Sequence, residues 1–232
     1  AASMILTDDN FATIVKAVTN GRNVYTNIKN SIRFLLSGNT AGILAVLYTS
    51  IMGLAVPFAP VHLLFINLLT DSLPAIAIGM EPARKNLLHQ PPRNPKEPIL
   101  TKRLFGSVLF EGALIAVATM GGYYLGMSAG GATLAMTMAF STLTLARLFH
   151  GFNCRGSESI FALGFRSNKY SLGAFFVGVA LLAAVLFVPG LKHLFMVADS
   201  FTLLNAGTVA LLAFCPTLII QAKKVVSGIL RK

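Results

Sequence analysis

A carboxylate with two polar neighbours stands within an otherwise apolar stretch. Asn67, Thr70 and Asp71 have the i, i+3 and i+4 spacing that places side chains on one face of a helix. They offer an amide carbonyl, a hydroxyl and a carboxylate, the hard oxygen ligands that suit calcium. Pro74 has no backbone N–H to donate and disfavours a regular helix over residues 70–73, so carbonyl oxygens there would become further ligands. The pattern predicts a cation site rather than only a polar contact between helices.

Two other polar features lie in predicted membrane spans. Asn39, within the small and polar run 37–42, could supply a carbonyl ligand to the same site or a hydrogen bond between helices. Arg147 carries a charge that must be paired or reach water. Its partner would be Asp71 or Glu111, or its guanidinium would snorkel to the nearby membrane surface. The sequence leaves these alternatives open.

The composition indicates a membrane protein. The chain is 55% hydrophobic with a mean hydropathy of +0.71, and 12% of its 232 residues are charged, against roughly 25% in an average soluble domain. The net charge of +11 could suggest nucleic-acid binding, but nearly all of the 19 Lys and Arg residues lie in polar stretches between or beside apolar runs. That distribution follows the positive-inside rule, so no nucleic-acid partner is expected.

The apolar runs position these polar residues on transmembrane helices. A span needs about 20 mostly apolar residues, and the sequence predicts six spans, at about 34–53, 61–80, 104–125, 132–150, 172–189 and 201–221. Residues 10–33 show helical spacing of apolar side chains, with Asp8 or Asp9 as candidate cap. The expected fold class is all-α: a six-span transmembrane helical bundle with a cytoplasmic helical stalk that extends the first span.

Basic segments and prolines indicate the orientation. The basic segments precede the first span, fill 81–103, follow the fourth span and end the chain, which places all of them and both termini in the cytoplasm. The 81–103 loop is rich in proline and is expected to be an irregular connector. Residues 126–131 (GMSAGG) are expected to form the turn between the third and fourth spans.

The sequence lacks the common motifs of catalytic and cofactor-binding sites. Cys154 and Cys215 have neither metal-ligand spacing nor the number needed for a disulfide framework, and the scattered histidines are expected to be loop or interface residues. There is no glycine-rich phosphate loop and no Ser/His/Asp arrangement. We therefore expect no catalytic residue and no cofactor site in this chain.

The residues 67–79 (NLLTDSLPAIAIG) closely resemble the sixth transmembrane helix of P-type (P2A-like) cation ATPases of the calcium-pump branch. Segments 6–14, 21–29 and 34–39 resemble the end of their phosphorylation domain, the stalk and the start of their fifth helix. The resemblance matches the six spans to helices five to ten. It implies the divisions 1–33 (end of the phosphorylation domain and stalk), 34–80 (two spans with the ion site), 81–103 (cytoplasmic loop), 104–221 (four spans) and 222–232 (cytoplasmic tail).

The resemblance also implies ligands for transported Ca²⁺, namely Asn39, Asn67, Thr70 and Asp71. Where two-site reticulum pumps carry ligand glutamates, this chain has Gly42 and Arg147. Both losses affect the same site, so the chain resembles the one-calcium bacterial pumps. Arg147 would then be a tethered cation in the vacated second site.

For the full-length parent, the resemblance implies a P-type translocase of the bacterial plasma membrane that uses ATP and Mg²⁺ and exchanges H⁺ for Ca²⁺. The expected partners are the lipid bilayer and a missing N-terminal half, with the actuator, nucleotide and phosphorylation domains and helices one to four. This chain alone is expected to be a non-catalytic fragment. Open alternatives are a pump for Mn²⁺ or Na⁺, a six-span channel or secondary transporter, and a truncated pseudo-pump.

Overall fold

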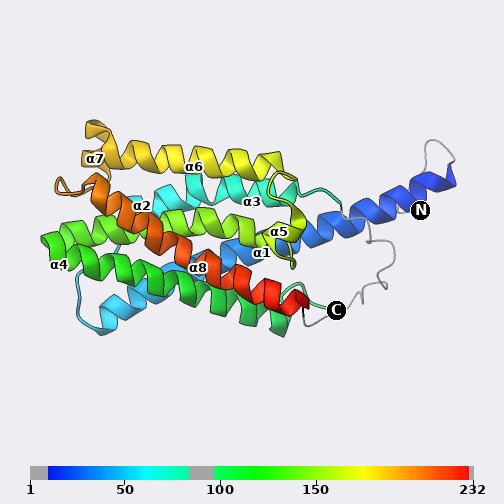
Figure 1. Cartoon of the computed structure of the whole chain (residues 1–232), viewed down its shortest axis with the longest axis horizontal. Coiled ribbons are helices and arrows are strands. Elements are labelled where there is room, and N and C mark those ends of the chain that lie inside the picture. The colour runs from blue at the N-terminus through cyan, green and yellow to red at the C-terminus, as the bar shows by residue number, and fades with distance from the viewer. Residues whose placement is uncertain (1–9, 84–96, 230–232) are drawn as a thin grey trace.

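The computed structural model describes residues 10–83 and 97–229, and its regular structure within these ranges is helical throughout (Figure 1). The all-α prediction is therefore confirmed for the described residues. The elements are α1 (Phe11–Ile51), α2 (Pro60–Phe65), the π-helical turn η1 (Ile66–Thr70), α3 (Ser72–Gly79), α4 (Lys102–Cys154), α5 (Ile160–Leu163), α6 (Lys169–Phe187), α7 (Pro189–Leu194) and α8 (Leu203–Ile229).

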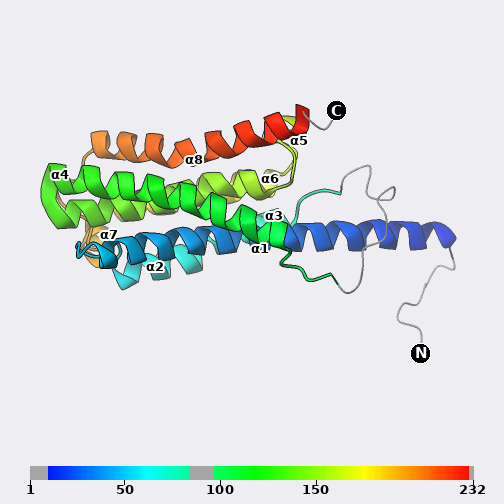
Figure 2. The same ribbon diagram turned by 90° about the horizontal axis from the view of Figure 1, so that it is seen from below.

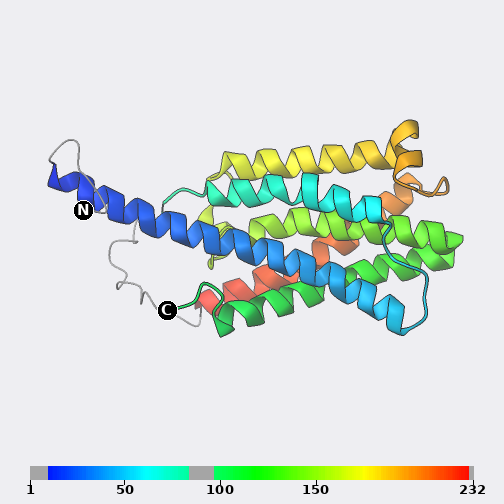
Figure 3. The same cartoon turned by 180° about the vertical axis from the view of Figure 1, so that it is seen from behind.

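Helix α1 is the predicted stalk and first span in one continuous element of 41 residues. Asn10 caps it by accepting a hydrogen bond from the backbone N–H of Ala12 at 2.9 Å. The candidate caps Asp8 and Asp9 lie outside the described residues. The N-terminal part of α1 projects well beyond the other helices (Figure 3), so a single helix connects that projecting end with the interior of the bundle.

Helix α4 contains the third and fourth predicted spans. Its 53 residues are interrupted at Gly130 and Gly131, and Gly131 has a φ of +75°, a backbone conformation that favours glycine. Figure 2 shows α4 doubling back on itself at this point. A Cβ on Gly126 would lie only 2.6 Å from Cα of Ala135, so glycine allows the two arms to approach closely. The turn is thus confined to Gly130 and Gly131, and is shorter than the predicted 126–131.

The bundle has an apolar exterior as well as an apolar core. Five helical segments are long and apolar enough to cross a membrane, at Ala12–Ile51, Pro60–Gly79, Lys102–Cys154, Lys169–Phe187 and Leu203–Ile229. The second arm of α4 is buried along nearly its whole length, between α1 and α8. Large apolar side chains such as Val117 and Leu211 remain exposed on the outside, where lipid would cover them.

A buried ion pair closes the bundle at the end of α3. The guanidinium of Arg155 is fully buried and donates to both carboxylate oxygens of Glu81, at 2.9 and 2.8 Å. Asn168, at the start of α6, donates to the same carboxylate at 2.7 Å, and Asn27 of α1 donates to the Glu81 carbonyl at 2.8 Å. These contacts connect α1 with the ends of α3, α4 and α6. The predicted 81–103 loop begins here, but its residues 84–96 lie outside the described ones.

Candidate cation site

The helix that contains Asp71 is interrupted just before this residue. The Asp71 N–H donates to the Ile66 carbonyl at 2.9 Å, an i to i−5 bond that defines the π-turn η1. Pro74 lacks an N–H, so the Thr70 carbonyl has no α-helical donor at that position. A loosened turn was predicted for residues 70–73 and is found over 66–71. π-turns of this kind are frequent at functional sites.

The three polar residues of this segment differ in burial. Thr70 and Asp71 are buried, with exposed fractions of 0% and 3%, whereas Asn67 is exposed. The Thr70 hydroxyl donates to the Ile66 carbonyl at 3.1 Å. The site therefore has an inner side at Thr70 and Asp71 and an outer side at Asn67.

Arg147 forms a buried ion pair with Asp71. Its Nη2 donates to Oδ2 of Asp71, and also to Oδ1 of Asn39 at 3.1 Å. The Arg147 side chain is 3% exposed, so it is paired within the bundle and does not snorkel to the surface. The structure thus brings together Asn39 of α1, Asp71 beside α3 and Arg147 of α4, which come from three separate predicted spans.

Glycine makes room for this guanidinium. A Cβ on Gly38 would lie 2.6 Å from Cζ of Arg147, which is closer than real Cβ atoms approach other atoms. At Gly42, in contrast, an added Cβ would meet only Cδ2 of Leu143 at 3.9 Å, an ordinary van der Waals contact. Gly38 is a site residue that the sequence analysis did not single out. Its signal was the run of small residues around Asn39.

The second candidate partner of Arg147, Glu111, pairs elsewhere. Its carboxylate accepts from Nε of Arg33 at 2.8 Å and from Nη2 of the same guanidinium. The alternative in which Glu111 neutralises Arg147 is therefore wrong. Glu111 belongs to a separate buried polar cluster with His150 and Cys154.

The Arg147–Asp71 pair leaves polar atoms without partners. Among the described residues, Oδ1 of Asp71 and Nε of Arg147 are buried and have no hydrogen-bond partner. Buried polar atoms are nearly always bonded, so an orphaned carboxylate oxygen inside a helical bundle requires a reason. A cation or water bound at Oδ1 would satisfy it.

Comparisons with known proteins identify the family of this chain. Residues 55–226 match the family described as "Cation transporting ATPase, C-terminus". The chain belongs to this family. The resemblance seen in residues 67–79 is confirmed, and a cation-transporting ATPase segment with long apolar helices is an integral membrane protein.

Relatives of known name support the calcium-transporting branch of these ATPases. The chain is 39% identical over 197 residues to "Calcium-transporting ATPase" of Bacillus subtilis (strain 168), covering 84% of this chain and 22% of that protein. It is 40% identical over 229 residues to "Calcium-transporting ATPase lmo0841" of Listeria monocytogenes, covering 98% and 26%. A third relative, "Calcium-transporting ATPase 1" of Lactococcus lactis, is 40% identical over 233 residues, covering 100% and 26%. The chain spans about a quarter of the length of these relatives.

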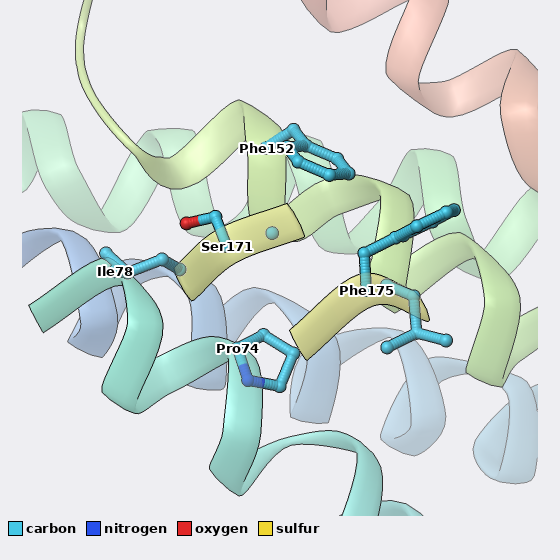
Figure 4. Close-up of a pocket in the computed structure, with 7 residues that line it drawn as sticks. Pro74, Ile78, Phe152, Ser171 and Phe175 are labelled. Carbon is cyan, nitrogen blue, oxygen red and sulfur yellow. The ribbon is translucent and has the colours of Figure 1, made fainter. Parts of the chain in front are cut away.

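A pocket beside the site in this ATPase segment has a different chemistry. It lies where α3 meets α4 and α6, and its walls include Pro74, Phe152 and Phe175 (Figure 4). These side chains offer no charged oxygen to a cation. The oxygen donors suited to calcium are instead those of Asp71 and Asn39, which do not line this pocket.

Proposed function

We propose that this chain is the C-terminal transmembrane part of an ATP-driven calcium pump and that it supplies part of a single intramembrane Ca²⁺ site. The observation that carries the proposal is the buried Arg147–Asp71 ion pair beside the π-turn, with Asn39 bonded to the same guanidinium. Asn39, Asn67, Thr70 and Asp71 are the ligands for Ca²⁺. An amide, a hydroxyl and a carboxylate form the hard oxygen set that calcium favours.

Arg147 explains why one site, rather than two, is proposed. Gly42 brings no carboxylate, and the guanidinium of Arg147 already contacts both Asn39 and Asp71. A tethered cation in this place repels a second metal ion and keeps Asp71 neutralised when the site is empty. The free Oδ1 of Asp71 is the oxygen that remains available to Ca²⁺.

The remaining ligands and the energy source would come from the rest of the parent protein. Asn39 and Asn67 are exposed, so the outer side of the site is open to further helices. In the proposed parent, these are helices one to four, and the actuator, nucleotide and phosphorylation domains use ATP and Mg²⁺. In the proposed transport cycle, Ca²⁺ enters the site beside Arg147 and leaves it in exchange for H⁺. The parent would lie in a bacterial plasma membrane with both termini cytoplasmic.

Helix α1 offers a direct mechanical link between the two parts. It runs without a break from its projecting end to Asn39, and at 1.5 Å per residue that distance is about 40 Å. A displacement of the projecting end, caused by phosphorylation in the parent, therefore shifts Asn39 relative to Asp71. Such a shift changes the distance between the ligands and releases the ion.

The test is transport by the full-length pump reconstituted in vesicles. We expect ATP-dependent Ca²⁺ uptake that is abolished by Asp71→Asn, with the exposed Asp199→Asn as a matched control that retains uptake. Stimulation of ATP hydrolysis by Mn²⁺ or Na⁺ but not by Ca²⁺ would overturn the assignment of the ion. Uptake without ATP would instead indicate a channel or a secondary transporter.

A further inference from the structure

A second group of metal-binding side chains is buried close to the Arg147 site. His150 and Cys154 lie on the second arm of α4, and Glu111 faces them from the first arm. Nε2 of His150 is 3.2 Å from Sγ of Cys154 and 3.5 Å from Oε2 of Glu111, and the three donor atoms all lie within 4.8 Å of one another. None of these donors belongs to the proposed calcium site.

The spacing of the donors fits tetrahedral coordination. With metal–ligand distances of about 2.0–2.3 Å, the edges of a zinc tetrahedron measure about 3.3–3.8 Å. The distances from Nε2 of His150 to Sγ of Cys154 and to Oε2 of Glu111 come close to that range without any rearrangement of the helices. The hydroxyl of Ser37 on α1 is 2.8 Å from the same nitrogen and is a neighbouring oxygen from a second helix.

The charges in the cluster permit a divalent ion. Arg33 neutralises Glu111, while the Cys154 thiol and the His150 imidazole can both be uncharged before loading. Binding of M²⁺ with loss of the thiol proton adds one net positive charge rather than two. Binding through Nε2 places the imidazole proton on Nδ1, which lies 3.4 Å from Nδ2 of Asn153.

The chemistry of the donors selects the metal. Thiolate and imidazole are ligands of zinc and of other thiophilic ions, whereas calcium takes oxygen ligands. The cluster is therefore different in kind from the oxygen site at Asp71. It is also bonded to α1 through Ser37 and Arg33, so a metal ion here would join α1 to both arms of α4.

We propose that Glu111, His150 and Cys154 bind one Zn²⁺ with release of the thiol proton, and that the bound ion fixes α1 against α4. Helix α1 carries Asn39, so an ion that fixes α1 against α4 would oppose the shift of Asn39 by which the proposed pump releases Ca²⁺. Zinc would thus inhibit transport from a site that is separate from the calcium ligands.

The chain contains a matched control for the test. Cys215 is the second cysteine, is exposed, and donates to the Leu211 carbonyl of its own helix at 3.3 Å. The purified chain in detergent is titrated with Cd²⁺, a zinc analogue whose thiolate charge-transfer band is visible in the ultraviolet. Zn²⁺ affinity is measured by competition with a chromophoric chelator. Circular dichroism checks that each variant remains helical.

We expect one Cd²⁺ per chain and the thiolate band in the wild type and in Cys215→Ser. Cys154→Ser should lose the band, and both Cys154→Ser and His150→Gln should weaken Zn²⁺ binding at least 10-fold. The proposal is overturned if the wild type binds no stoichiometric metal, if Cys154→Ser binds Zn²⁺ as tightly as the wild type, or if the band depends on Cys215. Because the calcium ligands are different residues, any of these failures leaves the proposed calcium site unaffected.

Discussion

Arg147 of α4 donates to the carboxylate of Asp71 across the bundle, and both side chains are buried. Removing one partner of a buried ion pair costs about 3–5 kcal/mol, because the other charge is left without compensation. The pair therefore couples the stability of the empty bundle to the same carboxylate that would bind the transported ion. In the proposed site, a metal ion and the guanidinium would both draw on the Asp71 carboxylate.

Replacing Arg147 by Met should destabilise the metal-free chain. The substitution leaves the Asp71 carboxylate buried and unpaired, so we expect a loss of about 3–5 kcal/mol of unfolding free energy. Denaturant or thermal unfolding in detergent, followed by circular dichroism, measures this loss. Arg147→Lys is the comparison: it retains the charge but not the planar fork that contacts both Asn39 and Asp71, so its effect should be smaller. Equal stability of Arg147→Met and the wild type would mean that the ion pair contributes nothing.

Gly38 and Gly42 provide a matched pair of substitutions on the same helix. Gly38→Ala places a methyl group 2.6 Å from Cζ of Arg147, and Gly42→Ala places one in ordinary contact at 3.9 Å from Leu143. We expect Gly38→Ala to cost about 1–3 kcal/mol, as overpacking does, and Gly42→Ala to be nearly neutral. Thermal unfolding of the two variants side by side measures the difference. If both lose the same stability, helix packing in general rather than the guanidinium accounts for the effect.

Part of this site could be predicted from the sequence. Pro74 indicated a loosened helix beside Asn67, Thr70 and Asp71, and the structure contains one. The break lies slightly earlier than predicted because the N–H of Asp71 reaches back five residues to Ile66. That π-turn leaves Asn67 exposed beside two buried neighbours, a difference that helical spacing alone does not predict.

Contacts between spans could not be predicted in this way. The sequence left Arg147 with two candidate partners and a route to the surface, and only the packing of α4 against α1 and α3 selects Asp71. The cluster of Glu111, His150 and Cys154 was missed because the predicted turn at 126–131 does not specify which residues of the two arms lie opposite each other, and Glu111 meets the other two only in the packed hairpin. The i, i+4 spacing of His150 and Cys154 was the signal that could have found it.

A second calcium site should be recoverable by two substitutions in the full-length pump. Gly42→Glu together with Arg147→Glu places carboxylates at the two positions where two-site pumps carry ligand glutamates, and removes the tethered cation. We expect the ratio of Ca²⁺ transported to ATP hydrolysed to rise from one towards two, with cooperative Ca²⁺ binding. Arg147→Met alone is the control, because it removes the cation without supplying a ligand. An unchanged ratio and unchanged cooperativity in the double variant would leave Arg147 with a structural role only.

The ion pair of Arg155 and Glu81 should control how firmly the end of α3 is held. Arg155 donates to both oxygens of Glu81 and also to the Ser167 hydroxyl at 2.5 Å. Arg155→Met leaves the buried Glu81 carboxylate without a charged partner, although the Asn168 amide still donates to it. We expect a loss of about 3–5 kcal/mol in unfolding free energy and faster hydrogen exchange at the end of α3.

Arg166, which is exposed in the same connection, provides the control: Arg166→Met should change stability by less than about 0.5 kcal/mol. Equal losses from the two variants would show that the buried pair has no special role. A loss confined to Arg155→Met, with faster exchange in α3, would show that this pair fixes the helix that carries Asp71.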